Sequence, residues 1–342
     1  MKRFLLLAFL LIVLAAGAAA WIFLGPATRF EGEKKALYIR TNAATKEAVL
    51  DSLLANRIIT NKTAFDFLAK RLNYWRNIRP GKYDIARGSS LLTIVRMLRN
   101  GNQAPVNLVI TRLRTQEDFA AFIGRRFECD SQQMMNFLRS PDSLKRFDAT
   151  PETSMWRVLP DTYTYRWSAS PSEIYEKINA ESDRFWNEER VQKAKELGLT
   201  PLQAYILSSI VEEETSNNEE KDTIASVYLN RYRKNMYLGA DPTLKFAVRD
   251  FSIKWIHGAI LETESPYNTY RNKGWPPGPI CTPSKRTIDE VLKAPDTDYL
   301  YFVANAHLSG HLFSTTFEEH VKKAQAYREE DKKRREQNQT IR

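Results

Sequence analysis

The first long feature of the hydropathy pattern is an apolar segment at the N-terminus. After Lys2-Arg3 the chain carries no charged residue from Phe4 to Leu24, and the run ends at Gly25-Pro26. As a helix, a segment of this length spans roughly 30 Å, the thickness of the hydrocarbon core of a bilayer. The pattern therefore predicts either a membrane anchor or an export signal.

The flanks of this segment predict its orientation. A basic pair at the start, Lys2-Arg3, favours an N-terminus in the cytoplasm, so everything after Gly25 is expected outside it, on the periplasmic side. The small residues Ala18-Ala19-Ala20 would suit a signal peptidase, but the apolar run continues through Trp21 to Leu24. The full length favours an uncleaved single-pass anchor, residues 4–24, in the inner (cytoplasmic) membrane, after a cytoplasmic stub of residues 1–3.

Short extended and helical patterns alternate between residues 36 and 109. A strand is expected at residues 36–39, and Phe65, Leu68, Ala69 and Leu72 follow the i, i+3, i+4, i+7 spacing of a helix. The turn Arg79-Pro80-Gly81-Lys82-Tyr83 leads into a second strand, and another amphipathic helix covers residues 91–99. This small α+β module resembles the LysM-like modules found beside wall-degrading domains. Glycan binding and a purely structural spacer both remain open for it.

From Gln116 onward the pattern becomes helix-rich. Apolar residues at helical spacing predict helices around residues 119–123 and 174–185, and residues 159–165 predict a turn into a short aromatic strand. Pro201 suits the first turn of a central helix that reaches about Thr215. The fold class is therefore α+β, with a helix-rich α+β catalytic domain over residues 110–321 and a charged tail over 322–342.

Composition narrows the choice of partners. The chain has 342 residues, enough for two domains, and its 43% hydrophobic and 27% charged residues are typical of a packed globular protein. A net charge of +10 would suit nucleic acid, an anionic bilayer surface or an acidic wall polymer. Because the chain is expected to be exported, nucleic acid is not expected as the partner of this positive charge. Part of the excess lies in Lys332-Lys333-Arg334-Arg335, within a stretch from about His320 that predicts a solvated helix.

Cysteine and histidine give little support for a metal or a disulfide framework. Cys129 and Cys281 are the only cysteines and lack metal-type spacing, so a single disulfide between them can be neither predicted nor dismissed. A zinc site would have to use His307 and His311, but Ser309-Gly310 interrupts any helix that would align them. We expect no metal and no cofactor.

The central helix carries the candidate chemistry. Leu207, Ile210 and Val211 form an apolar stripe, and Glu214 continues it on the same face. Glu212 and Glu213 are rotated from Glu214 by about 160° and 100°, so both are expected to face solvent. A carboxylate at the end of an apolar stripe is partly desolvated, which raises its pKa and suits a general acid. The same three glutamates would equally well form a solvated helix end.

The surrounding motifs favour the chemical interpretation. Eight motifs follow one another in the chain: Ser209–Thr215, Ala225–Arg231, Met236–Leu238, Asp241–Thr243, Ser265–Tyr270, Gly274–Ile280, Tyr299–Val303 and Gly310–Ser314. Together they closely resemble the endolytic murein transglycosylases of the MltG (YceG-like) family. The resemblance covers about Leu37 to Lys323, together with the membrane anchor.

The resemblance implies a reaction and a catalyst. Members of this family cleave the β-1,4 bond between N-acetylmuramic acid and N-acetylglucosamine in nascent peptidoglycan strands and leave a 1,6-anhydro end. The glutamate directly before Thr in the family's Glu-x-Glu-Thr motif corresponds to Glu214, which would serve as both acid and base. Glu212 is expected as a support residue. A link with peptidoglycan synthases, through which the enzyme would end strand elongation, is also implied.

Further polar residues in the motifs are expected to position the sugar: Asn230, Asp241, Asn268, Thr269, Tyr270 and His311. Turn and cap formation is the alternative role, since Asp241-Pro242 and Ser265-Pro266 are ordinary turn-initiating pairs. Two other functions stay open. One is a lysozyme-like muramidase in which a second carboxylate, Asp241, activates water. The other is a non-catalytic, membrane-bound wall-binding scaffold.

Three departures from the family pattern bear on specificity. The family usually carries Glu-Gly where this chain has Met155-Trp156, and Gln followed by Thr or Ser where it has Gly239-Ala240. Thr282-Pro283-Ser284 stands in place of Asn-Pro-Gly. These changes affect the expected fine specificity and leave the acid intact.

Overall fold

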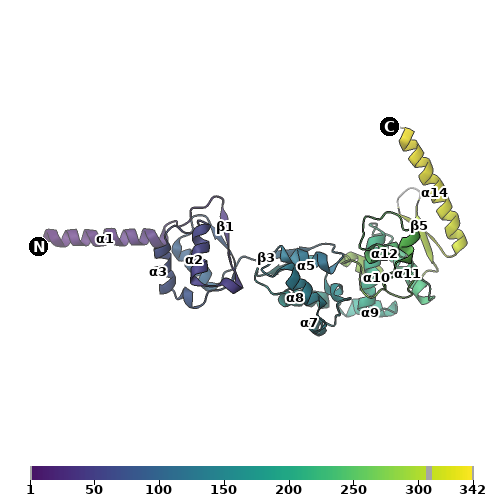
Figure 1. Ribbon diagram of the computed structural model, residues 1–342, viewed down its shortest axis with the longest axis horizontal. Helices are drawn as coiled ribbons and strands as arrows, with labels where there is room; N and C mark the ends of the chain where they lie inside the picture. Colours follow the sequence, from purple (N-terminus) through teal and green to yellow (C-terminus); the bar gives the residue numbers. More distant parts are fainter. Residues whose placement is uncertain (1, 306–309, 341–342) are drawn as a thin grey trace. The chain divides into compact units, whose positions relative to one another are not determined.

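The computed structural model describes residues 2–305 and 310–340, and Figure 1 shows their secondary structure along the chain. The chain forms two compact units, each described by itself below. The first unit contains Met1–Leu108, Ile123–Asp130 and Thr164–Ser170, and the second contains Val109–Phe122, Ser131–Tyr163 and Pro171–Arg342.

The N-terminal segment is the helix α1 (Lys2–Leu24), as its apolar pattern predicts. Its side chains are largely exposed, Phe4 and Leu11 among them, and the ring of Phe23 near its end lies 6.0 Å from that of Phe67. Across the part of the chain that the structure describes, α1 is the one helix long and apolar enough to cross a membrane. An exposed apolar surface of this length is a candidate membrane anchor.

The first unit is built on two antiparallel strands and three helices. Strand β1 (Lys34–Ile39) pairs with β2 (Gly81–Ala86) from Lys34 opposite Ala86 to Ile39 opposite Gly81. The helices are α2 (Lys46–Ala55), α3 (Lys62–Arg71) and α4 (Leu91–Asn100), and the short 3-10 helices are η1 (Thr41–Ala43) and η2 (Tyr74–Arg76). The alternating strands and helices predicted for this region are thereby confirmed.

Ordinary caps and an apolar core account for these helices. The side chains of Thr45, Asn61 and Ser90 accept hydrogen bonds from the first turns of α2, α3 and α4. The expected stripe of α3 faces the core, where Phe65 and Ala69 are fully buried. Helix α4 ends at Gly101, whose φ of 71° is the left-handed conformation that glycine adopts most easily.

Two later segments return to the first unit. The backbone N–H and hydroxyl of Thr41 donate to the two carboxylate oxygens of Glu128, each at 2.6 Å, and Tyr38 packs edge-on to Trp167 at 5.0 Å. The division between the units falls within α5 (Gln116–Gly124) and within β3 (Val106–Ile110) and β4 (Asp161–Tyr165), which pair in a two-stranded sheet.

The second unit is mainly helical. Its helices are α6 (Ser131–Arg139), α7 (Pro141–Leu144), α8 (Pro171–Phe185), α9 (Glu188–Glu196), α10 (Pro201–Glu214), α11 (Lys221–Arg233), α12 (Asp241–Ala247), α13 (Lys285–Val291) and α14 (Phe317–Thr340). The 3-10 helices are η3 (Lys145–Phe147), η4 (Ser154–Arg157) and η5 (Gly258–Glu262). Strand β5 (Tyr301–Ala304) pairs antiparallel with β6 (His311–Ser314). Helix α14 contains the predicted C-terminal helix.

Helix α10 occupies the centre of the second unit. Thr200 and Gln203 form a capping box at its start, and Pro201 holds the first helical position, as expected. Every residue from Ala204 to Val211 is buried, because α9, α11, α12 and α13 all pack against this helix. Figure 1 labels α9, α11 and α12 beside α10. A helix that is buried all round has no solvent face, and this changes the environment of its glutamates.

The cysteines and histidines were considered above for a disulfide and for a metal site. Cys129 and Cys281 are both buried free thiols and form no disulfide. His307 lies outside the described residues. No group of three or more His, Cys, Asp or Glu side chains within residues 2–305 and 310–340 could hold a metal ion.

Candidate active site

Glu214 is the last residue of α10, and Thr215 leaves the helix in an extended conformation. The Glu214 side chain accepts a hydrogen bond of 2.5 Å at Oε1 from the hydroxyl of Tyr228. Burial of the carboxyl group is the main effect on its pKa, which rises to about 7. The Tyr228 hydrogen bond lowers this pKa by a smaller amount. A carboxyl group with a pKa near neutrality can both donate and accept a proton at working pH.

Tyr228 comes from the middle of α11 and was not among the residues that the sequence singled out. Its side chain is 1% exposed, and its ring packs edge-on against Phe302 of β5 at 5.9 Å. Burial holds the pKa of Tyr228 well above its usual value, so the hydroxyl keeps its proton and acts as a donor. Tyr228 therefore fixes the orientation of Glu214 from a rigid, buried position.

Asp241 and Tyr270 form a second polar pair. The Tyr270 hydroxyl donates to Asp241 Oδ1 at 2.5 Å. Burial and this hydrogen bond both raise the pKa of Tyr270, and the charge of Glu214 raises it further. The charge of Asp241 in turn raises the pKa of Glu214. The structure thus brings three residues from the sequence prediction, Glu214, Asp241 and Tyr270, into one electrostatic group.

Cations from two helices complete this group. The charges of Lys245, on α12, and Arg231, on α11, both lower the pKa of Glu214. Arg231 is fixed by hydrogen bonds from its guanidinium to the carbonyls of Leu300, at 2.7 Å, and Leu238. Neither cation was singled out from the sequence, although Arg231 closes the Ala225–Arg231 motif.

Asn268 organises the loop before Tyr270. Its amide nitrogen donates to the carbonyls of Leu261 and Thr263, both at 2.9 Å, and its Oδ1 accepts from the Tyr270 N–H at 3.0 Å. The side chain is completely buried. Its hydrogen bonds are directed into the loop itself, and in this way Asn268 determines where Tyr270 lies.

Thr269 connects the same loop to the start of α12. Its hydroxyl accepts from the Ala240 N–H at 2.9 Å and shares a hydrogen bond of 2.8 Å with Thr243. The Thr269 carbonyl accepts from the Gly239 N–H at 3.1 Å. These bonds hold the backbone that carries Asp241, so Thr269 acts on the site through the loop.

Asn230 and His311 also hold backbone segments. The Asn230 amide donates to the carbonyls of Thr297, at 2.6 Å, and Tyr299, at 3.1 Å, just before β5. His311 contacts Glu220 twice: its ring Nδ1 lies 2.9 Å from Oε1, and its backbone N–H donates to Oε2 at 2.9 Å. Both residues therefore fix the β5–β6 hairpin to α11.

Glu220 is a further residue that the sequence did not indicate. Its Oε1 accepts from the hydroxyl of Thr215 at 2.5 Å, directly beside Glu214. Burial raises the pKa of Glu220, but the hydrogen bonds from Thr215 and His311 outweigh it and leave the pKa below its usual value. The carboxylate of Glu220 thus links the turn after Glu214 to the hairpin.

Glu212 and Glu213 do not face solvent, and this part of the sequence prediction was wrong. Glu212 Oε2 accepts from Lys221 Nζ at 3.0 Å and from the Thr287 hydroxyl, with the two charged side chains 16% and 5% exposed. Glu213, at 13% exposure, makes a bidentate ion pair with Arg114 at 3.2 and 2.9 Å. The helical wheel assumed a solvent face, whereas α10 is surrounded by other elements on every side.

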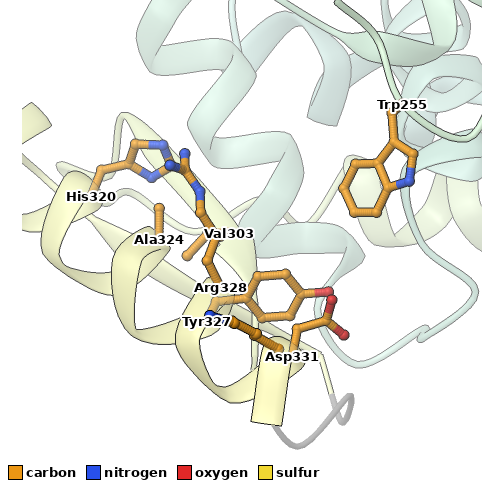
Figure 2. Close-up of a pocket in the computed structure, with 8 residues that line it drawn as sticks. Trp255, Val303, His320, Ala324, Tyr327, Arg328 and Asp331 are labelled. Atoms are coloured by element: carbon orange, nitrogen blue, oxygen red, sulfur yellow. The ribbon is translucent and has the colours of Figure 1, made fainter. Parts of the chain in front are cut away.

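A separate cavity of about 640 Å³ lies between Trp255 and α14. In Figure 2 the Trp255 ring stands across this space from Tyr327 and Arg328. Val303, His320, Ala324, Asp331 and Lys332 complete its lining. Glu212, Glu213 and Glu214 are not part of this lining.

Comparison with known proteins extends this picture. The model of the YceG-like family matches residues 37–326.

The chain belongs to the YceG-like family.

The resemblance seen in the sequence motifs is thereby confirmed. The chain is 25% identical to the endolytic murein transglycosylase of Bacillus subtilis (strain 168) over 301 residues, which cover 84% of this chain and 83% of that protein. It is 24% identical over 294 residues to the endolytic murein transglycosylase of Streptococcus pneumoniae serotype 2 (strain D39 / NCTC 7466), covering 77% of this chain and 53% of that longer protein.

A solved structure is similar as well. The crystal structure of a yceG-like protein from Listeria monocytogenes aligns with a TM-score of 0.56 and 28% sequence identity, covering 85% of this chain and 98% of that one. The helix-rich α+β architecture is therefore that of a YceG-like protein.

Two departures from the family pattern have structural roles in this YceG-like chain. Met155 and Trp156 are both 6% exposed, and the Tyr205 hydroxyl donates to the Met155 carbonyl at 3.3 Å. The Thr282 N–H donates to the Leu113 carbonyl at 2.8 Å, and the Leu113 N–H donates to the Thr282 hydroxyl at 2.9 Å. At both places the residues of this chain are held by packing and by hydrogen bonds to the backbone.

Proposed function

We propose that this chain is a membrane-anchored peptidoglycan lytic transglycosylase in which Glu214 is the single catalytic acid and base. Its substrate would be the β-1,4 bond between N-acetylmuramic acid and N-acetylglucosamine within nascent glycan strands. Its product would carry a 1,6-anhydromuramic end. The names of the relatives from Bacillus subtilis and Streptococcus pneumoniae support the reaction class.

The observation that carries the assignment of Glu214 is its environment. Its carboxyl group lies at the end of a buried helix, has a pKa of about 7, and is held by the Tyr228 hydroxyl at 2.5 Å. Glu212 and Glu213 are both neutralised by ion pairs with Lys221 and Arg114. Glu214 is instead held by a neutral hydroxyl, and its pKa of about 7 suits a proton-transfer group.

The reaction follows from one carboxyl group. Protonated Glu214 gives its proton to the glycosidic oxygen as the bond from that oxygen to muramic C1 breaks. The muramic C6 hydroxyl oxygen then bonds to C1, and its proton passes to the Glu214 carboxylate. Because the substrate supplies its own nucleophile, no water is consumed and the acid is regenerated. A second carboxylate at a fixed separation, which a hydrolytic glycosidase requires, is not needed.

The remaining polar residues are assigned supporting roles. Asp241 and Tyr270 are proposed to contact the sugar, because their hydrogen-bonded pair acts electrostatically on Glu214. We assign Asn230, Asn268, Thr269 and His311 to positioning the backbone around the substrate. Glu212 is a positioning residue that ties α10 to Lys221 of α11.

Mass spectrometry of digested glycan strands tests the proposal. Wild-type protein should produce 1,6-anhydromuramic ends, and Glu214→Gln should lose that activity by at least about 1,000-fold, since it removes the proposed acid and base. Glu219→Gln is a matched control, because Glu219 is an exposed glutamate in the following turn. Full activity in Glu214→Gln would exclude this residue as the catalyst.

The same products distinguish the two alternatives. Reducing muramic ends in place of anhydro ends would identify a lysozyme-like hydrolase with Asp241 as the second carboxylate. No cleavage by intact wild-type protein, together with retained binding to glycan strands, would support a wall-binding scaffold.

The proposed location follows from α1 and its basic start. We place α1 in the inner membrane with Lys2-Arg3 in the cytoplasm and the catalytic unit on the periplasmic side, where peptidoglycan lies. Protease added outside intact spheroplasts should digest the catalytic unit, and complete protection would contradict this orientation. We also propose peptidoglycan synthases as partners, and failure of crosslinked wild-type protein to recover any synthase would count against them.

A further inference from the structure

A small cavity of about 100 Å³ lies beside the proposed acid, between α10, α12 and the loop after α12. It is lined by Arg114, Glu213, Pro242, Lys245, Phe251 and Ile280. Pro242 and Ile280 are buried and contribute the apolar part of a lining that is otherwise mainly polar. Since one water occupies roughly 30 Å³ in the liquid, the volume suits a group of three to five heavy atoms.

The charges on this cavity are unequal. Glu213 holds Arg114 in a bidentate ion pair and lies 3.5 Å from the Arg112 guanidinium, so two cations share one carboxylate. The Arg114 guanidinium is fixed further by stacking on the Phe251 ring, 4.6 Å away. Arg114 and Glu213 therefore balance each other in the cavity lining, and Lys245 is the remaining charge.

Lys245 contributes an additional cation without a partner. Its side chain is half-buried and makes no hydrogen bond or ion pair with any residue that the structure describes. It acts electrostatically on Glu214, lowering the pKa of that group. A half-buried ammonium group that faces a cavity and has no counterion within reach among the described residues is suited to an anionic ligand group.

We propose that this cavity binds a carboxylate on the lactyl substituent of muramic acid, with the Lys245 ammonium as its main contact. The inference rests on the proposed function. Muramic acid differs from N-acetylglucosamine by a lactyl ether, which either ends in a carboxylate or continues into a stem peptide that carries carboxylates. Either source supplies the same chemistry, and the alkyl carbons beside the carboxylate would pack on Pro242 and Ile280.

Occupation of the cavity would also favour catalysis. A bound carboxylate neutralises Lys245 and so removes one of the charges that lower the pKa of Glu214. Glu214 would then hold its proton more firmly in the substrate complex than in the free enzyme. Lys245 would thus link recognition of muramic acid to the acid form of Glu214.

Binding measurements on full-length protein in detergent test this inference independently of turnover. Calorimetry would compare the Glu214→Gln protein with its Lys245→Met, Lys245→Arg and Lys254→Met derivatives, Lys254 being an exposed lysine on the following loop. Three tetrasaccharide fragments serve as probes: one with stem peptides, one with free lactyl carboxylates, and one with the lactyl groups converted to methylamides.

We expect Lys245→Met to raise the Kd about tenfold for a carboxylate-bearing fragment and less than twofold for the methylamide, the effect of one charge-assisted hydrogen bond. Lys245→Arg should restore binding, and Lys254→Met should not affect it. A tenfold effect confined to the peptide-bearing or to the lactyl fragment identifies the source of the carboxylate. Equal losses for all three fragments, no loss for any, or no binding at all would overturn the inference. The proposed function fails separately, if wild-type protein forms no anhydro ends.

Discussion

The hydroxyl of Tyr228 donates a 2.5 Å hydrogen bond to Oε1 of Glu214 and so connects the last residue of α10 to the middle of α11. Two effects on Glu214 oppose each other at this point. Burial of the carboxyl group raises its pKa, and the Tyr228 hydrogen bond, which favours the charged form, lowers it. The pKa of about 7 is the balance of the two, and it can be shifted by changing either residue.

Tyr228→Phe removes the hydrogen bond and keeps the buried ring. The pKa of Glu214 should then rise above about 7, because the charged form loses its donor. Since the reaction begins with protonated Glu214, activity falls as pH rises through this pKa. The alkaline limb of the kcat/KM profile should move upward by up to about one pH unit, and kcat should fall about tenfold as the carboxyl group loses its orientation. An unmoved alkaline limb would show that Tyr228 only packs.

Glu214→Gln should stabilise the protein at alkaline pH. A folded-state pKa raised to about 7, above an unfolded value near 4.5, means that the folded protein holds this proton more strongly, so its stability declines between these pH values. The amide in Glu214→Gln does not ionise, so the variant does not lose this stability as the pH rises. At pH 8 the Tm should rise by about 2–6 °C, and at pH 4 it should hardly change. The exposed control Glu219→Gln should show no pH-dependent difference, and equal Tm changes at both pH values would contradict the account.

The ion pair between Glu212 and Lys221 should matter for stability more than for chemistry. Both side chains are largely buried, so Lys221→Met leaves an uncompensated carboxylate and should cost about 3–5 kcal/mol. The double variant Glu212→Gln/Lys221→Met should cost less, because no buried charge remains unpaired. Denaturant unfolding of the wild-type, Lys221→Met and double-variant proteins measures these free energies of unfolding. Glu212→Gln should retain far more activity than Glu214→Gln, and equal inactivation of the two would place Glu212 in the chemistry.

Gly310 should not tolerate a side chain. Its φ is +126°, and an added Cβ would lie 2.6 Å from Oε2 of Glu220, the carboxylate that holds His311. Gly310→Ala should lower the Tm by several degrees and reduce activity, because Glu220 also accepts from Thr215 beside the acid. Gly274→Ala is the matched control, since Gly274 also has a positive φ but nothing lies within 4 Å of the added Cβ. Equal effects of the two variants would show that backbone strain alone is responsible.

Helical phase and cap chemistry are local, and the sequence predicted what depends on them. The stripe of α3 and the start of α10 at Pro201 follow from spacing and residue type, and both are confirmed. The same phase directed Glu214 toward the interior. Its half-buried side chain and raised pKa agree with that direction.

The environment on the other sides of α10 could not be predicted in this way. Lys221 and Arg114 reach Glu212 and Glu213 from other segments, so a helical wheel drawn for α10 alone assigned both glutamates to solvent. Tyr228 illustrates the same limit, because its contact with Glu214 depends on how α11 packs. The return of residues 123–130 and 164–170 to the first unit likewise left no local signal.

The central claim is that Glu214 catalyses bond cleavage without water, and digestion of glycan strands in water labelled with heavy oxygen tests it most directly. Mass spectrometry of the new muramic ends should show unlabelled 1,6-anhydro termini with wild-type and Glu219→Gln protein, and none with Glu214→Gln. Labelled reducing ends, or anhydro ends that persist at the wild-type rate in Glu214→Gln, would contradict it.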